Sequence, residues 1–342
     1  MLQFLETQQE RDTWLENKLT EQKGASSAGH HYIQAYNQNK WGFYLRYIRG
    51  LEPIHTKPAL LFGGNIHDAK EAFYFSHGDI DFTLKAFEAI HKSRKKEYES
   101  PSQAAKDLED GKKMLFHWAS HTGHSDFENY ELIEVEGSHE FELANLMKAS
   151  VRWDLLARKK SNGKYYLFDT KTTRYSITAS YNSVEGQDQV SMYLLALKKV
   201  YPDYYKECVG LIPDIMYKKQ SVVSSERPGI VMRSERELKE YEQEIIGLHL
   251  ELSQKVNALR NGFPPQLVHL LFPRNGKDDS YFGSDWPGIY RQNLPEDPYK
   301  APPGYKINIE ILENGPAIDT KLGNDELAYE KIQANLTRKE ES

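Results

Sequence analysis

The chain has 342 residues, which is long enough to bury a hydrophobic core without disulfides or a structural metal. Its 39% hydrophobic and 27% charged residues lie in the range of globular proteins and exclude a wholly disordered chain. The single cysteine, Cys208, excludes an internal disulfide and any site built from several cysteines of this chain. The formal net charge of -6 argues against a protein that coats nucleic acid by bulk electrostatics. It does not argue against an enzyme that gathers carboxylates around cations.

The sequence predicts a soluble protein without a membrane partner. Its first residues have neither a basic start nor a long apolar run, and no window approaches the roughly 18 apolar residues of a membrane span. A single cysteine fits a reducing compartment. We therefore expect a cytoplasmic location.

Three helical segments are predicted in the first part of the chain. Residues 1 to 24 form a charged amphipathic pattern, so residues 1–28 are expected to be an N-terminal helical appendage. A second helix is predicted from about Gly64 to Tyr74. The polar, lysine-rich region that follows predicts a helical insertion over about residues 91–125, for which a lid over a groove is one weaker idea.

The centre of the sequence predicts a β-hairpin. Two runs rich in aromatic and β-branched residues, at 149–157 and 164–173, are separated by a polar turn that contains Asn162 and Gly163. A helix is predicted within 186–202, and a further strand is predicted at 209–217.

A last long helix is predicted to begin at a capping box formed by Ser234 and Glu237 and to extend toward residue 260. The order helix, strand, strand, helix, strand, helix predicts an α/β fold with a mixed central β-sheet flanked by helices. The segment 298–342 is predicted to be a polar C-terminal tail.

The hairpin carries the residues on which a chemical function would depend. Asp154 lies near the end of its first strand, and Asp169 and Lys171 lie two residues apart on the second. Side chains two apart on a strand share a face, so a carboxylate and an ammonium are presented side by side. Phosphodiester hydrolysis requires cations, an attacking hydroxide and stabilisation of the leaving group, and these residue types can supply such a site. An Asp-x-Lys pair alone is more often a surface ion pair.

The wider pattern resembles a known family. The segment RWDLLARKKSNGKYYLFDTKTT resembles the signature of RecB-like exonucleases in the PD-(D/E)xK nuclease superfamily. Upstream, the spacing of Gly63, His67 and Glu71 resembles the family's first motif, in which a helical histidine binds metal. Downstream, Gln189 and Tyr193 resemble the Gln-x-x-x-Tyr motif, which in such enzymes faces the nucleic acid.

The resemblance implies a PD-(D/E)xK domain over residues 29–297 and a deoxyribonuclease that uses Mg²⁺ or Mn²⁺. The implied catalytic residues are His67, Asp154, Asp169 and Lys171, and the implied metal ligands are His67, Asp154, Asp169 and Thr170. Lys171 would orient or help deprotonate the attacking water. Basic residues mingled with tyrosines suit a single DNA strand. The expected substrate contacts are Gln189, Tyr193, Glu71, Arg46 and Tyr181.

The sequence departs from relatives that carry a 4Fe-4S cluster. Four non-cysteine residues stand roughly where the cluster cysteines would be, and we expect no iron–sulfur cluster. These residues are Asn39, Asp279, Trp286 and Gln292. Trp286 is a candidate for an apolar plug that replaces the cluster.

The sequence leaves several alternatives open. A zinc site at His117, His121 and His124 is not favoured, because Trp118 stands where a zincin requires its glutamate. The sequence contains no glycine-rich phosphate-binding loop, so an ATP-driven motor is not favoured. The expected activity is exonucleolytic, on single strands or DNA ends in recombination, repair or phage DNA processing, with a possible recombination or replication protein partner. A non-cutting DNA-binding or assembly subunit and a site-specific endonuclease are the rival functions.

Overall fold

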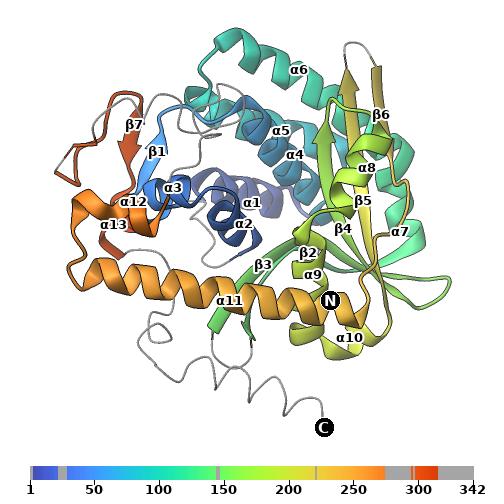
Figure 1. The fold of residues 1–342 in the computed structure, drawn as a ribbon. Coiled ribbons are helices and arrows are strands. Elements are labelled where there is room, and N and C mark those ends of the chain that lie inside the picture. Colours follow the sequence, from blue (N-terminus) through green and yellow to red (C-terminus); the bar gives the residue numbers. More distant parts are fainter. Residues whose placement is uncertain are drawn as a thin grey trace. The chain divides into compact units, whose positions relative to one another are not determined.

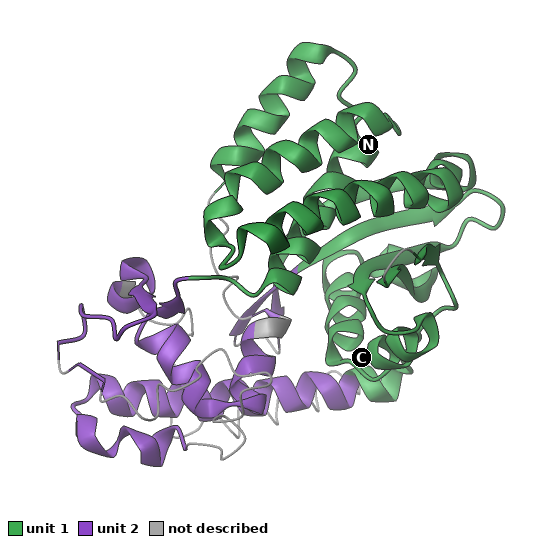
Figure 2. Ribbon diagram, turned by 90° about the horizontal axis from the view of Figure 1, so that it is seen from above, with its two compact units in different colours: residues 1–24, 55–139, 152–238 green, residues 25–54, 140–151, 239–342 purple. Residues whose placement is uncertain are grey.

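A computed structural model of the chain describes residues 3–21, 29–143, 147–219, 222–273, 294–295 and 297–314. The chain divides into two compact units, each built from three segments (Figure 2). Unit 1 comprises residues 1–24, 55–139 and 152–238. Unit 2 comprises residues 25–54, 140–151 and 239–342. All the expected site residues except Arg46 belong to unit 1.

The described residues contain a five-stranded sheet with the strand order β2-β3-β4-β5-β6 (Figure 1). In that order the strands are Tyr130–Leu143, Met147–Lys159, Tyr165–Thr173, Cys208–Lys219 and Val222–Glu226. Strand β4 pairs antiparallel with β3 and parallel with β5, and β6 pairs antiparallel with β5. The predicted α/β fold with a mixed sheet flanked by helices is therefore confirmed.

The predicted hairpin is formed by β3 and β4. Leu155 pairs with Phe168, and Gly163 in the turn has φ 71°, a backbone conformation that glycine adopts without the steric cost of a Cβ. Side chains on β4 alternate between the two faces of the sheet. Phe168 packs in the core with residues of helix α4 (Pro58–Phe75), whereas Asp169 accepts a hydrogen bond from a residue of helix α9 (Asp188–Val200). Neighbouring residues of β4 therefore face different helices: Phe168 faces α4, and Asp169 faces α9.

One apolar core joins the sheet to helix α4 and helix α6 (Pro101–Trp118). Its largest buried side chains include Phe73, Trp118 and Phe168. Helix α4 begins earlier than the predicted helix. Pro58 lies in its first turn, where proline is favoured because the N–H that it lacks would have no partner within the helix. Burying these aromatic rings provides the main apolar contribution to the stability of this unit.

Helix α6 differs from the expected insertion. Met114, Leu115 and Trp118 lie in the core, and α6 contacts strands β5 and β6. Helix α5 (Ile80–Ser93) packs on it so closely that a Cβ at Gly111 would lie 2.1 Å from the ring of Phe87. Besides its lysines, α6 carries an apolar stripe at helical spacing. This helix therefore packs on the sheet and does not form a lid.

The N-terminal helix, α1 (Gln8–Thr20), begins at a capping box formed by Thr7 and Glu10. It contacts α5, and its buried Lys18 forms an ion pair of 2.7 Å with Glu71 on α4. The segment that the sequence predicts as an appendage is therefore tied to the helix that carries His67.

Unit 2 is built around aromatic side chains. Tyr36, Phe43 and Phe272 are buried and in ring contact. Asn39, which stands near an expected cysteine position of the cluster-bearing relatives, caps a short helix by accepting a hydrogen bond of 2.6 Å from the N–H of Gly42. The described elements of unit 2 are α2 (His30–Gln38), α3 (Lys40–Phe43), the π-helix η1 (Tyr44–Ile48), β1 (Leu51–Pro53), most of α11 (Glu235–Arg260), the 3-10 helix η4 (Pro265–Leu267), α12 (Val268–Leu271), β7 (Tyr305–Ile307) and α13 (Ile309–Asn314), together with the end of β2 and the start of β3.

Helix α11 begins where the sequence predicts. Ser234 and Glu237 form the predicted capping box at the start of α11. Strand β7 pairs antiparallel with β1, so part of the segment expected to be a polar tail is folded. Asp279, Trp286, Gln292 and residues 315–342 lie outside the described residues. None of the helices in the described ranges is long and apolar enough to cross a membrane.

Candidate metal and catalytic site

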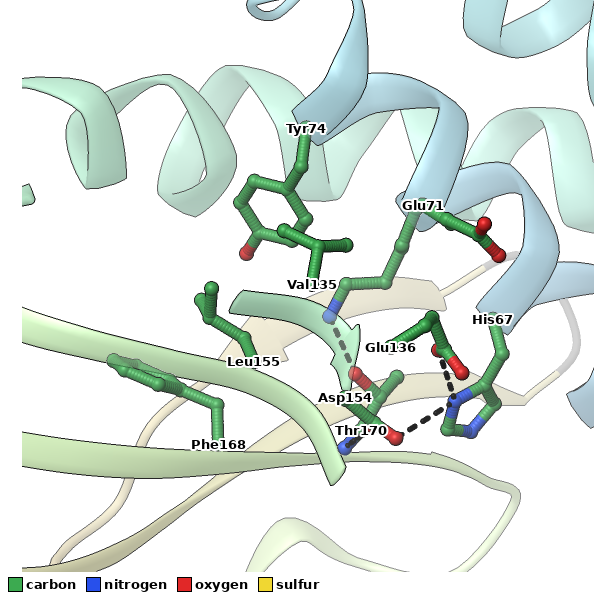
Figure 3. Close-up of a pocket in the computed structure, with 10 residues that line it drawn as sticks. His67, Glu71, Tyr74, Val135, Glu136, Asp154, Leu155, Phe168 and Thr170 are labelled. Atoms are coloured by element: carbon green, nitrogen blue, oxygen red, sulfur yellow. Dashed lines mark hydrogen bonds and ion pairs between the residues drawn. The ribbon is translucent and has the colours of Figure 1, made fainter. Parts of the chain in front are cut away.

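Three potential metal ligands converge where helix α4 meets strands β2 and β3. One ligand atom from each of His67, Glu136 and Asp154 lies within 4.8 Å of the other two. The Nδ1 atom of His67 is 3.2 Å from Asp154 Oδ1 and 3.7 Å from Glu136 Oε1. Figure 3 shows the three side chains pointing toward one another from their separate elements. The predicted meeting of His67 with Asp154 is present in the structure.

The charges of this group are strongly coupled. Burial disfavours the imidazolium, but the carboxylates of Asp154 and Glu136 outweigh burial and raise the pKa of His67 to about 10. Burial alone would raise the pKa of Asp154, but His67 and the N–H of Thr170 lower it to about 2. The two carboxylates thus favour positive charge at His67, and a bound cation would supply such charge at the same place.

Sequence reasoning missed Glu136, because it did not predict strand β2. Glu136 has φ 50°, a left-handed conformation that costs a residue with a Cβ roughly 1–2 kcal/mol. Such strain persists only where the surroundings impose it, and it is often found at functional sites. Here it directs the Glu136 carboxylate to His67, and Arg152 Nε holds the same carboxylate at 3.0 Å. An alternating acidic and apolar pattern interrupted by Gly137 was a usable signal for a strand with a bulge.

A second group of polar side chains lies along β4 and α9. Lys171 Nζ is 2.8 Å from Asp169 Oδ2 and donates to Gln189 Oε1 at 2.8 Å. Gln189 Nε2 donates to Tyr193 Oη at 2.9 Å, and Tyr193 Oη donates to the main-chain oxygen of Arg152 at 2.7 Å. Burial raises the pKa of Asp169, and Lys171 opposes this shift. Lys171 remains 28% exposed, so its ammonium can reach water.

Thr170, which lies between Asp169 and Lys171 on β4, contacts both Asp154 and Lys70. Its N–H donates to Asp154 Oδ2 at 2.6 Å, and its hydroxyl accepts a hydrogen bond of 2.6 Å from Lys70. Figure 3 shows Thr170 beside Asp154. The expected place of Thr170 among the metal ligands remains a prediction.

The other expected substrate contacts are distributed over the fold. Glu71 lines the pocket that contains His67 and Asp154, and its carboxylate is paired with Lys18. Tyr181 is half-buried on helix α8 (Ile177–Glu185). Arg46 is exposed on η1 of unit 2. Their roles toward a substrate stay predictions.

The histidines of the HWASHTGH segment do not form a three-residue metal group among the described residues. Both ring nitrogens of His124 lie within hydrogen-bonding distance of main-chain oxygens, those of Ala119 at 2.7 Å and Gly78 at 3.0 Å. The rings of His117 and His121 are stacked, with centroids 3.9 Å apart.

The donor set at His67, Glu136 and Asp154 fits a divalent cation. It offers one imidazole nitrogen and two carboxylates, and a cation that binds there would take the place of the proton on His67. Carboxylate oxygens suit Mg²⁺ and Mn²⁺, and imidazole suits the softer divalent ions. The expected ligand Asp169 is not one of these three residues, but its charge interacts with those of Asp154 and His67, so it would be a further ligand.

A mixed sheet whose central hairpin carries two aspartates and a lysine beside a helical histidine defines a metal-dependent phosphodiesterase type of site. Residues 30–264 match the family model described as the PD-(D/E)XK nuclease superfamily. The chain belongs to this superfamily and is a nuclease by family. No curated protein matched the chain.

Proposed function

We propose that the protein is a Mg²⁺- or Mn²⁺-dependent DNA exonuclease that acts on single strands or duplex ends in recombination, repair or phage DNA processing, in the cytoplasm. The observation that supports this function best is the convergence of His67, Asp154 and Glu136 next to the Asp169–Lys171 pair. The exonucleolytic mode rests on the RecB-like resemblance of the motifs. A recombination or replication protein is a further proposed partner.

Each residue has a distinct part in the proposed hydrolysis. A bound divalent cation would supply positive charge for the nonbridging phosphate oxygens and lower the pKa of a water. His67, Asp154 and Asp169 would hold it, with Glu136 as an additional ligand. Lys171 would orient the attacking water, because its ammonium is fixed by Asp169 and Gln189 yet partly exposed.

The decisive experiment uses purified protein with DNA labelled at one end. We expect single-stranded or blunt duplex DNA to be shortened progressively from an end in the presence of Mn²⁺ or Mg²⁺, and EDTA to abolish the reaction. Discrete internal fragments, or cutting of closed circular DNA, would identify an endonuclease instead. DNA binding without cutting under all metal conditions would favour the non-cutting subunit and contradict the proposed activity.

A further inference from the structure

A buried ionic network lies behind strand β4, on the face of the sheet that packs against α4. Its charged members are Lys70, Asp126, Asp214 and Arg227. Lys70 and both aspartates are buried, and the Arg227 side chain is only 15% exposed. Two cations and two carboxylates balance, which such a set requires because burying an unpaired ion is strongly unfavourable.

The contacts of Asp214 make this network rigid. Its Oδ2 atom accepts hydrogen bonds from Lys70 Nζ at 2.7 Å, Trp118 Nε1 at 2.9 Å and Arg227 at 3.1 Å. Arg227 also donates to Asp126 at 2.7 Å. The ammonium of Lys70 lies 4.4 Å from the centre of the Trp118 ring. Lys70 is therefore held from several directions and has little freedom to move.

Lys70 also connects the network to the candidate metal site. Its ammonium donates to the hydroxyl of Thr170 at 2.6 Å, and the N–H of Thr170 donates to Asp154 Oδ2 at 2.6 Å. Lys70 lies three residues after His67 on α4, and residues at that spacing are neighbours on a helix surface. One helix thus presents a ligand and a support for a second ligand.

We propose that Lys70 is a positioning residue for metal binding: it fixes Thr170, whose main-chain N–H in turn orients the carboxylate of Asp154. The inference rests on the proposed function, because it takes Asp154 as a ligand of the cation. Among the described residues, Lys70 reaches Asp154 by hydrogen bonds through Thr170, and its charge also favours the ionised Asp154 carboxylate. Groups that orient metal ligands in this way typically change metal affinity by about 10–100-fold.

The test is the affinity of the full-length protein for Mn²⁺ without DNA, measured by electron paramagnetic resonance of the free ion. Thr170→Val removes the hydroxyl but keeps the main-chain N–H, and we expect it to weaken Mn²⁺ binding about tenfold. Thr170→Ser restores the hydroxyl and should bind within about twofold of the wild type. Lys70→Met should match Thr170→Val. Wild-type affinity in both Thr170→Val and Lys70→Met would overturn the inference.

Controls separate positioning from stability. Lys218→Met breaks another largely buried ion pair, with Asp110 at 3.1 Å, and should lower the thermal midpoint while keeping Mn²⁺ affinity. If Lys70→Met does not fold, the comparison of Thr170→Val with Thr170→Ser decides alone, and equal affinities would overturn the inference.

Asp154→Ala shows whether the titrated Mn²⁺ is bound at this site. A wild type that binds Mn²⁺ through Asp154 but cuts no DNA would contradict the proposed function and leave this inference standing. A wild type that binds no Mn²⁺ would contradict both.

Discussion

Tyr193 donates a hydrogen bond of 2.7 Å to the main-chain oxygen of Arg152, which ties helix α9 to the strand that carries Asp154. The same hydroxyl accepts from Gln189, whose Oε1 accepts from Lys171. Both motif side chains are buried, with 8% of Gln189 and 6% of Tyr193 exposed. Their polar atoms form hydrogen bonds to other groups of the protein. The structure therefore favours a role in holding Lys171 over a direct contact with DNA.

We therefore expect Gln189→Ala to lower kcat about tenfold with little change in KM for DNA, because Lys171 loses one of its two acceptors and keeps only Asp169. Tyr193→Phe should lower the free energy of unfolding by about 1–2 kcal/mol, since the Arg152 oxygen loses its donor. Steady-state cleavage kinetics and urea unfolding measure the two effects. A rise in KM at unchanged kcat in Gln189→Ala would instead show that this residue contacts the substrate.

Replacing Lys171 should remove cleavage and leave the fold intact. Lys171→Ala deletes a partly exposed ammonium, and the loss of such a catalytic group typically costs about 10²–10⁴-fold in rate. DNA binding and the thermal midpoint should change little. Lys206→Ala, at an exposed lysine of the same unit, is the matched control and should cut normally. Wild-type cleavage by Lys171→Ala in Mn²⁺ would remove the catalytic assignment.

Two substitutions at Glu136 can separate the effect of its carboxylate from the effect of its left-handed backbone conformation. Glu136→Ala and Glu136→Gly both delete the carboxylate, so both should weaken Mn²⁺ binding by about tenfold, as read by calorimetric titration. Glycine tolerates φ 50°, whereas alanine keeps the strain. We therefore expect the glycine variant to be more stable than the alanine variant by about 1 kcal/mol in urea unfolding. Equal stabilities would show that the conformation is not strained, and unchanged Mn²⁺ affinity would exclude Glu136 as a ligand.

His249 should make unit 2 sensitive to acid. It is buried on α11, and burial lowers its pKa to about 4, from 6.5. The unfolded chain therefore binds this proton more tightly, so stability is complete above about pH 7 and is lost as the pH falls from 6.5 toward 4. The loss at pH 5 is about 2 kcal/mol.

The test compares the free energies of unfolding of the wild type and His249→Leu, measured in urea at pH 7 and at pH 5. The variant should lose less stability between these two values, because it has no imidazole to protonate. The exposed His55 provides the control, and His55→Leu should keep the wild-type difference. Parallel losses in wild type and His249→Leu would contradict the assignment.

The sequence by itself determined the hairpin and its chemistry. Asn162 and Gly163 specify a tight turn, and the two-residue spacing of Asp169 and Lys171 places them on one face of β4. The helical repeat around His67 likewise specified α4. These features depend on local geometry with a fixed repeat, so they can be read without knowing which elements pack together.

Only the tertiary structure decided which groups surround the hairpin aspartates. Glu136 joins His67 and Asp154 because β2 lies beside β3 and Glu136 has a left-handed backbone conformation, and Lys70 reaches Thr170 because α4 packs against β4. Helix α6 belongs to the core although its sequence is largely polar, because a narrow apolar stripe suffices once a sheet covers it. These contacts join residues far apart in the chain, and their formation depends on the packing of whole elements, which no local pattern encodes.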